Sequence, residues 1–178
     1  MSHDTLEKKI QKLEQIFNTG NAYHESELLA KSLLSESKIA EHPVLQCRTL
    51  LMLSESLWRR GYSEDAFPYL EESLSISQSI PDQSLEARAL MQLGVVSRSF
   101  SQNENALEYL LKALEINYRI ADKRVVASTI GNIGLIYEEN NDYTNALRYY
   151  HDALNVFEEL EDNNGRATAL GNIGHIYI

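Results

Sequence analysis

Apolar residues recur three or four positions apart along nearly the whole chain, a spacing that builds one face of a helix. Ala87, Leu90 and Leu93 belong to one such stripe, and Ala106 and Leu110 belong to the next. Short polar stretches between the stripes supply residues that end one helix and cap the following one. The pattern predicts nine helices, near residues 4–19, 24–41, 44–60, 63–79, 83–100, 103–120, 123–140, 143–160 and 163–178.

The stripes repeat at an interval of 40 residues. Residues 130–137 nearly match residues 170–177, and Gly94, Gly134 and Gly174 keep the same interval. Self-similarity at such a period is typical of a stacked array in which each unit is one supersecondary element. We therefore expect a single array of helix pairs, with repeats at about 4–42, 43–82, 83–122 and 123–162 and a partial unit at 163–178.

The polar stretches predict how individual helices begin and end. Gly61 and either Asn140 or Asn141 can take the left-handed conformation that follows a helix C-terminus. Ser63 and Asp142 can cap the helices that come after them.

The mid-helix glycines need a physical reason, because glycine costs about 1 kcal/mol relative to alanine in a helix interior. We expect Gly94, Gly134 and Gly174 to let two helix backbones approach closely. The small residues predicted to lie opposite them on the second helices are Ala66, Ala106 and Ala146.

Composition and charge narrow the class of protein. The chain has 178 residues, a single Cys and a formal net charge of −10. One Cys excludes an internal disulfide and a cysteine-based zinc site. The acidic balance argues against nucleic acid and anionic membranes as main partners. No apolar run is long enough to span a bilayer and the start lacks the features of a secretory signal, so we expect a cytoplasmic protein.

Catalytic motifs are lacking in the sequence. The five His show no metal-ligand spacing, and there is no phosphate loop or nucleophile elbow. Glu138 and Glu139 diverge by about 100° on a helix, which favours a solvated face over a catalytic pair. Cys47 is expected to be buried and inert. We predict no enzyme activity, no cofactor and no metal site.

The fourth unit carries a longer motif, made of Ile133-Gly134, Tyr137, Ala146, Tyr150 and Ala153-Leu154. This set resembles the tetratricopeptide repeat, whose usual unit has 34 residues. The 40-residue unit is similar to the long-repeat type found in the Pins/LGN spindle regulators, kinesin light chains and bacterial signalling arrays. The resemblance covers essentially the whole chain. It implies an all-α, right-handed superhelical solenoid of antiparallel helix pairs.

The second unit departs from this motif. Ser54 stands where the motif has glycine, and Leu57 stands where it has tyrosine. Pro68 lies within the helix expected at 63–79, where it either distorts the first turn or moves the helix start.

The resemblance also implies where a partner binds. Arrays of this kind bind extended partners in a concave groove lined mostly by the first helices. The predicted peptide-binding residues at groove registers are Arg48, Trp58, Arg59, Arg88, Gln92, Arg98, Ser128, Asn132, Leu135, Asn172 and His175.

Asn132 and Asn172 are the sharpest candidates in this set. An amide side chain offers both an acceptor and two donors, so it can pair with the C=O and N–H of an extended peptide without reading its sequence. The same register holds Gln92 and Met52 in the earlier units, which interrupts a continuous asparagine ladder. The alternative is that both asparagines bond only within the helix framework or to water.

The groove arginines predict a basic stretch toward the N-terminal half of the groove, suited to an acidic segment of the partner. Alternatively, Arg48, Arg59, Arg88 and Arg98 are solvated rim residues.

The sequence ends inside a first helix, at Ile178, so we expect a piece of a longer array. Its exposed apolar end is a candidate homodimer contact. The function predicted is a non-catalytic scaffold that binds a protein or an extended peptide. The alternatives are a regulatory or dimerisation input domain of a bacterial nucleotide cyclase or kinase, and a sensor of signalling peptides.

Overall fold

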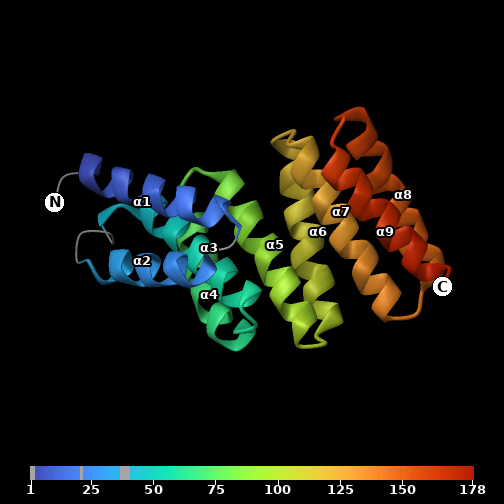
Figure 1. Ribbon diagram of the computed structural model, residues 1–178, viewed down its shortest axis with the longest axis horizontal. Helices are drawn as coiled ribbons and strands as arrows, with labels where there is room; N and C mark the ends of the chain where they lie inside the picture. Colours follow the sequence, from blue (N-terminus) through green and yellow to red (C-terminus); the bar gives the residue numbers. More distant parts are fainter. Residues whose placement is uncertain (1–2, 21, 37–40) are drawn as a thin grey trace. The chain divides into compact units, whose positions relative to one another are not determined.

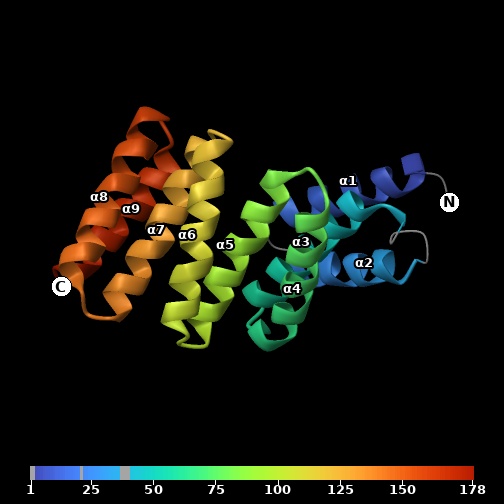
Figure 2. The same cartoon turned by 180° about the vertical axis from the view of Figure 1, so that it is seen from behind.

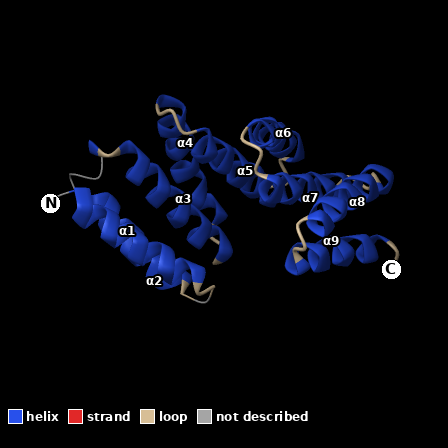
Figure 3. Cartoon of the chain, turned by 90° about the horizontal axis from the view of Figure 1, so that it is seen from above, coloured by secondary structure: helices blue, strands red, loops and turns tan. Residues whose placement is uncertain are grey.

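The computed structural model describes residues 3–20, 22–36 and 41–178. Within these ranges every regular element is a helix and no strand occurs (Figures 1 and 3). The described helices are α1 (His3–Asn18), α2 (Tyr23–Ser35), α3 (Pro43–Arg59), α4 (Ser63–Ser79), α5 (Gln83–Ser99), α6 (Asn103–Arg119), α7 (Lys123–Glu139), α8 (Tyr143–Glu159) and α9 (Asn163–Ile176). The protein is an all-α helical repeat, as the hydrophobic pattern predicts.

The predicted helix bounds agree with the observed ones to within two residues, except at the end of α2. We expected that helix to reach residue 41, but it ends at Ser35, and the backbone of Glu36 is extended. Leu33 is the last fully buried side chain of α2. Residues 37–40 of the predicted helix lie outside the described residues.

Gly20 after α1 has a positive φ, and so do the residues that follow α3, α5, α6, α7 and α8, which lie 20 or 40 positions apart. The residues with positive φ after these five helices are Gly61, Ser101, Ala121, Asn141 and Glu161. In each turn the next residue donates its N–H to the carbonyl five positions earlier, as Asp142 does to Tyr137 at 2.9 Å. This bond is the signature of a Schellman motif. The prediction is confirmed for Gly61, and Asn141 rather than Asn140 takes the left-handed position.

The turn at residue 81 has to differ, because proline cannot take a positive φ. Ile80, the residue before Pro81, is extended with ψ 151°, which is the conformation that a following proline favours. Pro68 does not move the start of α4, because the helix begins at Ser63 and continues through the proline.

Aspartates at the 40-residue spacing cap the first helices of the repeats. The side chain of Asp82 accepts N–H groups at the start of α5, and those of Asp122 and Asp162 do the same for α7 and α9. Asp142 caps α8 by accepting from the backbone N–H of Asn145, as predicted. The predicted cap at Ser63 is wrong, since α4 follows Tyr62 without a side-chain cap.

The chain divides into two compact units, residues 1–96 and 97–178. In the first unit α2 packs on α1 and α3, and α4 packs on α3. In the second unit α7 packs on α6 and α8, and α9 packs on α8 and contacts α7, seen from opposite sides in Figures 1 and 2. Each unit has its own apolar cluster, one around Leu6, Ile10, Leu13, Leu33, Met52, Leu53 and Leu57, the other around Val126, Ala127, Ile130, Ala153, Leu154, Phe157 and Ala169.

Gly134 is a packing contact, and the ring of Tyr150 is its nearest neighbour. A Cβ added at Gly134 would lie 2.6 Å from this ring, which is fully buried. The predicted approach of Gly134 to Ala146 stays a prediction. At Gly174 an added Cβ would meet nothing within 4 Å.

None of the helices in the described part of the chain combines the length and apolar character needed to cross a membrane.

Candidate functional site

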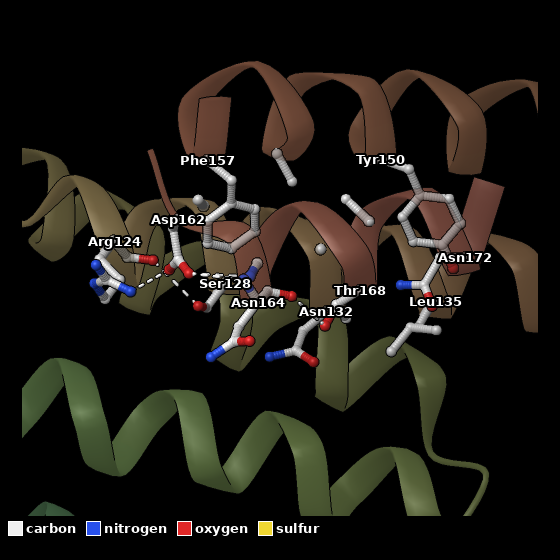
Figure 4. A pocket seen from close by; sticks show the side chains of 15 residues that line it. Arg124, Ser128, Asn132, Leu135, Tyr150, Phe157, Asp162, Asn164, Thr168 and Asn172 are labelled. Carbon is white, nitrogen blue, oxygen red and sulfur yellow. Dashed lines mark hydrogen bonds and ion pairs between the residues drawn. The ribbon is translucent and has the colours of Figure 1, made fainter. Parts of the chain in front are cut away.

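A pocket with a volume of about 360 Å³ opens in the second unit between α7, α8 and the start of α9. Four of the predicted peptide-binding residues line it together: Ser128, Asn132, Leu135 and Asn172. Figure 4 shows the amides of Asn132 and Asn172 and the side chain of Leu135 on one side of this pocket, with the rings of Phe157 and Tyr150 opposite. The 40-residue repeat thus brings residues from two consecutive first helices into one site.

The two asparagine amides form no hydrogen bonds with the described part of the chain. Both side chains are half-buried. The hydroxyls beside them are already engaged, because Ser128 donates to the carbonyl of Arg124 and Thr168 donates to the carbonyl of Asn164. The unused donors and acceptors of the pocket wall therefore sit mainly on amide groups.

An ion pair and a helix cap fix one end of the pocket. Asp162 accepts the backbone N–H groups of Asn164 and Gly165 and also pairs with the guanidinium of Arg124. This arrangement ties the first turn of α9 to α7 and leaves the two charged residues of the lining neutralised by each other (Figure 4).

The opposite wall rests on buried aromatic packing. Phe157 is 7% exposed and covers Gly165, where an added Cβ would lie 2.2 Å from its ring. Tyr150 donates its hydroxyl to Glu138 at 2.5 Å. Burial, reinforced by this bond to a carboxylate, raises the pKa of Tyr150 well above its ordinary value, so the phenol stays protonated.

Glu138 is not the solvated residue that the sequence indicates. Its side chain is 14% exposed, and its second oxygen lies 2.5 Å from Nδ1 of His175 on α9. His175, another predicted groove residue, is exposed and does not line the pocket. Glu138 therefore links α7, α8 and α9 around the site rather than facing a ligand.

The predicted groove arginines of the first unit are engaged by carboxylates. Arg48 on α3 forms ion pairs of 2.8 Å with Glu7 and 2.7 Å with Glu14, both on α1. Burial opposes the charged form, but the hydrogen bonds to Glu14 and Glu7 prevail and raise the pKa of Arg48. Arg48 therefore joins the first helices of two consecutive repeats.

Glu55 lies close to three further predicted groove residues. It accepts from Arg59 at 2.9 Å and from Nε2 of Gln92 at 3.1 Å, and a nitrogen of Arg88 lies 3.9 Å away. Gln92 is 8% exposed, and its Oε1 is buried without a partner among the described residues. Trp58 packs partly buried against the apolar cluster of the first unit.

Arg98 pairs with Glu139 at 2.5 Å in the second unit. All four groove arginines are thus close to carboxylates, so the expected basic stretch is largely neutralised. The number of arginines at groove registers does not set the local charge, since the fold places acidic residues beside them.

Sequence reasoning missed Asn164 and Phe157 among the lining residues. Phe157 belongs to a second helix, whereas the groove registers considered were those of first helices. Asn164 lies one repeat after Arg124, in the first turn of α9, outside those registers. The 40-residue spacing between Arg124 and Asn164 was the available signal.

Other predicted features are accounted for as follows. Cys47 is fully buried with its thiol 3.2 Å from the hydroxyl of Ser73, and burial raises its pKa. Within the described ranges no group of three or more His, Cys, Asp or Glu side chains is placed to hold a metal ion. Leu170 on α9 and Tyr177, which follows α9, are exposed, at 51% and 73%, and the homodimer contact there stays a prediction.

Comparison with solved structures identifies similar folds at low sequence identity. A Rap protein complexed with competence and sporulation factor matches with a TM-score of 0.82 and 17% identity, over 94% of this chain and 48% of that one. A putative kinesin light chain with nearly identical TPR-like repeats from Podosopora anserina has a TM-score of 0.74 and 14% identity, over 99% of this chain and 88% of that one. BtubC from P. vanneervenii has a TM-score of 0.67 and 19% identity, over 97% and 65%.

The chain spans less than two thirds of BtubC and about half of the Rap protein, and at these identities the likeness concerns the fold. No relative among curated proteins matches the chain. A family model described as tetratricopeptide repeat matches residues 45–119 and 125–178, which is well over half of the sequence. Members of this family are in general non-catalytic. The chain belongs to the tetratricopeptide repeat family.

Proposed function

We propose that this protein is a non-catalytic scaffold that binds an extended peptide segment of a partner protein in the pocket between α7, α8 and α9. The observation that carries the proposal is the pair Asn132 and Asn172. These amides come from the same register of consecutive repeats, line one pocket and have no partner within the described chain.

The backbone of an extended peptide presents alternating C=O and N–H groups. The backbones of the scaffold helices do not hydrogen-bond to these groups. Each asparagine amide can accept one hydrogen bond from a backbone N–H and donate another to a backbone C=O. Two amides supplied by two helices would hold the segment in register across the pocket. The Rap protein of similar fold was solved with competence and sporulation factor, which is consistent with this kind of partner for this scaffold.

The other predicted contacts contribute unequally to this proposal. Ser128 and Leu135 line the pocket beside the amides and would contact the segment. Arg48, Arg59, Arg88, Arg98 and Gln92 already bind carboxylates, so a ligand would have to exchange those interactions. The proposal therefore rests on α7 and α9 rather than on the arginines.

The test begins with a linear peptide selected against the full chain from a random displayed library. Its Kd is then measured for the wild type, Asn132→Ala, Asn172→Ala and the double variant. Each lost amide removes up to two hydrogen bonds of about 0.5–1.5 kcal/mol each, so each single change should weaken binding roughly five- to hundredfold.

Asn155→Ala is the matched control, because Asn155 is an exposed asparagine on α8 that does not line the pocket. It should leave the Kd unchanged. Equal affinity for the double variant and the wild type would refute the proposed role of the amides.

A further inference from the structure

We infer that the pocket also holds one uncharged, apolar side chain of the bound segment, aliphatic or aromatic, beside the backbone that Asn132 and Asn172 engage. This inference rests on the proposed function and adds the chemical class of residue that the site selects. It follows from the lining, charge and size of the pocket.

Much of the pocket lining is apolar. It includes Phe157, Ala153, Ala127 and Ala169, none of which exposes more than 7% of its surface. A methyl or methylene group placed against these side chains would leave water, which favours its binding. Figure 4 shows the ring of Phe157 on the other side of the pocket from Asn132.

The charges of the lining disfavour an ionised side chain. Among the described residues, the charged side chains that line the pocket are Arg124 and Asp162, and they pair with each other. Asp162 is further engaged by two N–H groups of α9. A carboxylate or ammonium group of the ligand would lose its hydration without gaining a free opposite charge. The charges of the pocket lining therefore favour a neutral side chain of the ligand over an ionised one.

The size of the pocket fits a whole side chain. An apolar cavity of about 150 Å³ holds a benzene molecule, and this pocket, at about 360 Å³, has more than twice that volume. A leucine or phenylalanine side chain can therefore enter together with the peptide group that carries it.

The chain offers a position where this space can be filled without disturbing the fold. A Cβ added at Gly131, which lines the pocket, meets nothing within 4 Å. Gly171 lies at the same register one repeat later, also meets nothing, and does not line the pocket. Gly131→Leu therefore fills the pocket, and Gly171→Leu is its matched control.

The probes are tripeptides Ala-Xaa-Ala, acetylated and amidated at their ends, with Xaa as Leu, Phe, Ala, Asp or Lys. Each is titrated into the isotope-labelled full chain while NMR follows the side-chain amides of Asn132 and Asn172 and the ring of Phe157. The Leu and Phe peptides should bind roughly tenfold or more tightly than the Ala peptide. Gly131→Leu should abolish this preference, and Gly171→Leu should keep it.

The outcomes separate this inference from the function beneath it. Equal affinities for the Leu and Ala peptides, with shifts at both asparagine amides, would overturn the side-chain inference and leave the proposed function standing. Tighter binding of the Asp or Lys peptide, or a Leu preference that survives Gly131→Leu, would overturn it as well. Shifts at Phe157 without any change at the asparagines would contradict the proposed function, and no saturable shift from any probe would overturn both.

Discussion

Residues 52 and 132 occupy the same register of the 40-residue repeat, yet one lies in an apolar core and the other lines an open pocket. Met52, in the first unit, is 2% exposed and belongs to one apolar cluster with Leu6, Ile10 and Leu13 of α1. Asn132, in the second unit, is half-buried and has no partner within the described chain. Repeat position alone does not decide whether a residue supports the fold or offers a binding surface.

The polar and charged residues at groove registers also differ between the two units in whether they have partners within the protein. In the first unit, Arg48 is held by two carboxylates of α1, and Gln92 donates to Glu55. In the second unit, the amides of Asn132 and Asn172 have no partner within the described chain, and Arg124 and Asp162 of the pocket lining pair with each other. Polar groups at groove registers form hydrogen bonds or ion pairs within the protein where a neighbouring helix supplies a partner. Where no helix supplies one, these groups remain unpaired.

The largest expected effect comes from exchanging residues at this shared register. Met52→Asn places an amide in the apolar cluster and removes its packing, so unfolding of the first unit should become easier by about 3 kcal/mol or more. Asn132→Met should change stability by less than about 1 kcal/mol, because the pocket gives its side chain room. Hydrogen exchange of α3 and α7 measures each unit separately, which matters because repeat arrays need not unfold in one step.

If both exchanges proved equally costly, the contrast between core and pocket at this register would be wrong. Asn155→Met, on the exposed side of α8, controls for the helix preference of methionine.

A second, smaller effect concerns how each unit fills the space between its paired helices. Gly134 faces Tyr150 in the second unit, whereas the corresponding positions in the first unit hold Ser54 and Leu70. Gly134→Ser should destabilise the second unit by about 1–3 kcal/mol, because the ring of Tyr150 is buried and held by Glu138. Combining it with Tyr150→Leu recreates the pair of the first unit.

The double variant should lose less stability than the sum of the two single variants, by about 0.5–3 kcal/mol, in a urea titration. Gly131→Ala serves as the matched control and should add up to about 1 kcal/mol, because its new methyl group meets nothing and alanine favours the helix. Strict additivity of the two losses would show that the glycine and the tyrosine are not coupled.

The smallest expected effect concerns the ion pairs of the first unit. Arg48→Met should lower stability by about 1 kcal/mol or less, since its pairs with Glu7 and Glu14 are partly exposed. The loss should shrink in 0.5 M NaCl because salt screens charges near the surface. Affinity for a peptide bound in the second unit should not change. A loss of peptide affinity would instead place Arg48 in the binding site.

The fold was largely predictable because its signals are local and repeated. The 3.6-residue stripes gave nine helices, and the aspartates at positions 82, 122 and 162 marked the starts of three of them. The glycine contact was only half predictable. The interval between Gly94, Gly134 and Gly174 pointed to close packing, but the identity of the neighbour depends on which rotamer Tyr150 adopts in the packed pair.

The candidate site was predictable only in part. The repeat register selected Asn132 and Asn172, which do line one pocket. It equally selected Arg48 and Gln92, which are engaged within the fold, because the carboxylates that bind them are 34–41 residues away in sequence. The pattern of residues along the sequence does not indicate which distant side chains come into contact.

The sequence by itself determined the helices, their period and their family, because hydrophobic spacing and capping chemistry act over only a few residues. Tertiary structure alone decided which equivalent positions become core, ion pair or open pocket, since that depends on the side chains a neighbouring helix brings within contact. Met52 and Asn132 share a register and differ in this respect. Met52 is buried among the leucines and isoleucine of α1, whereas Asn132 lines the pocket with an amide that has no partner within the described chain.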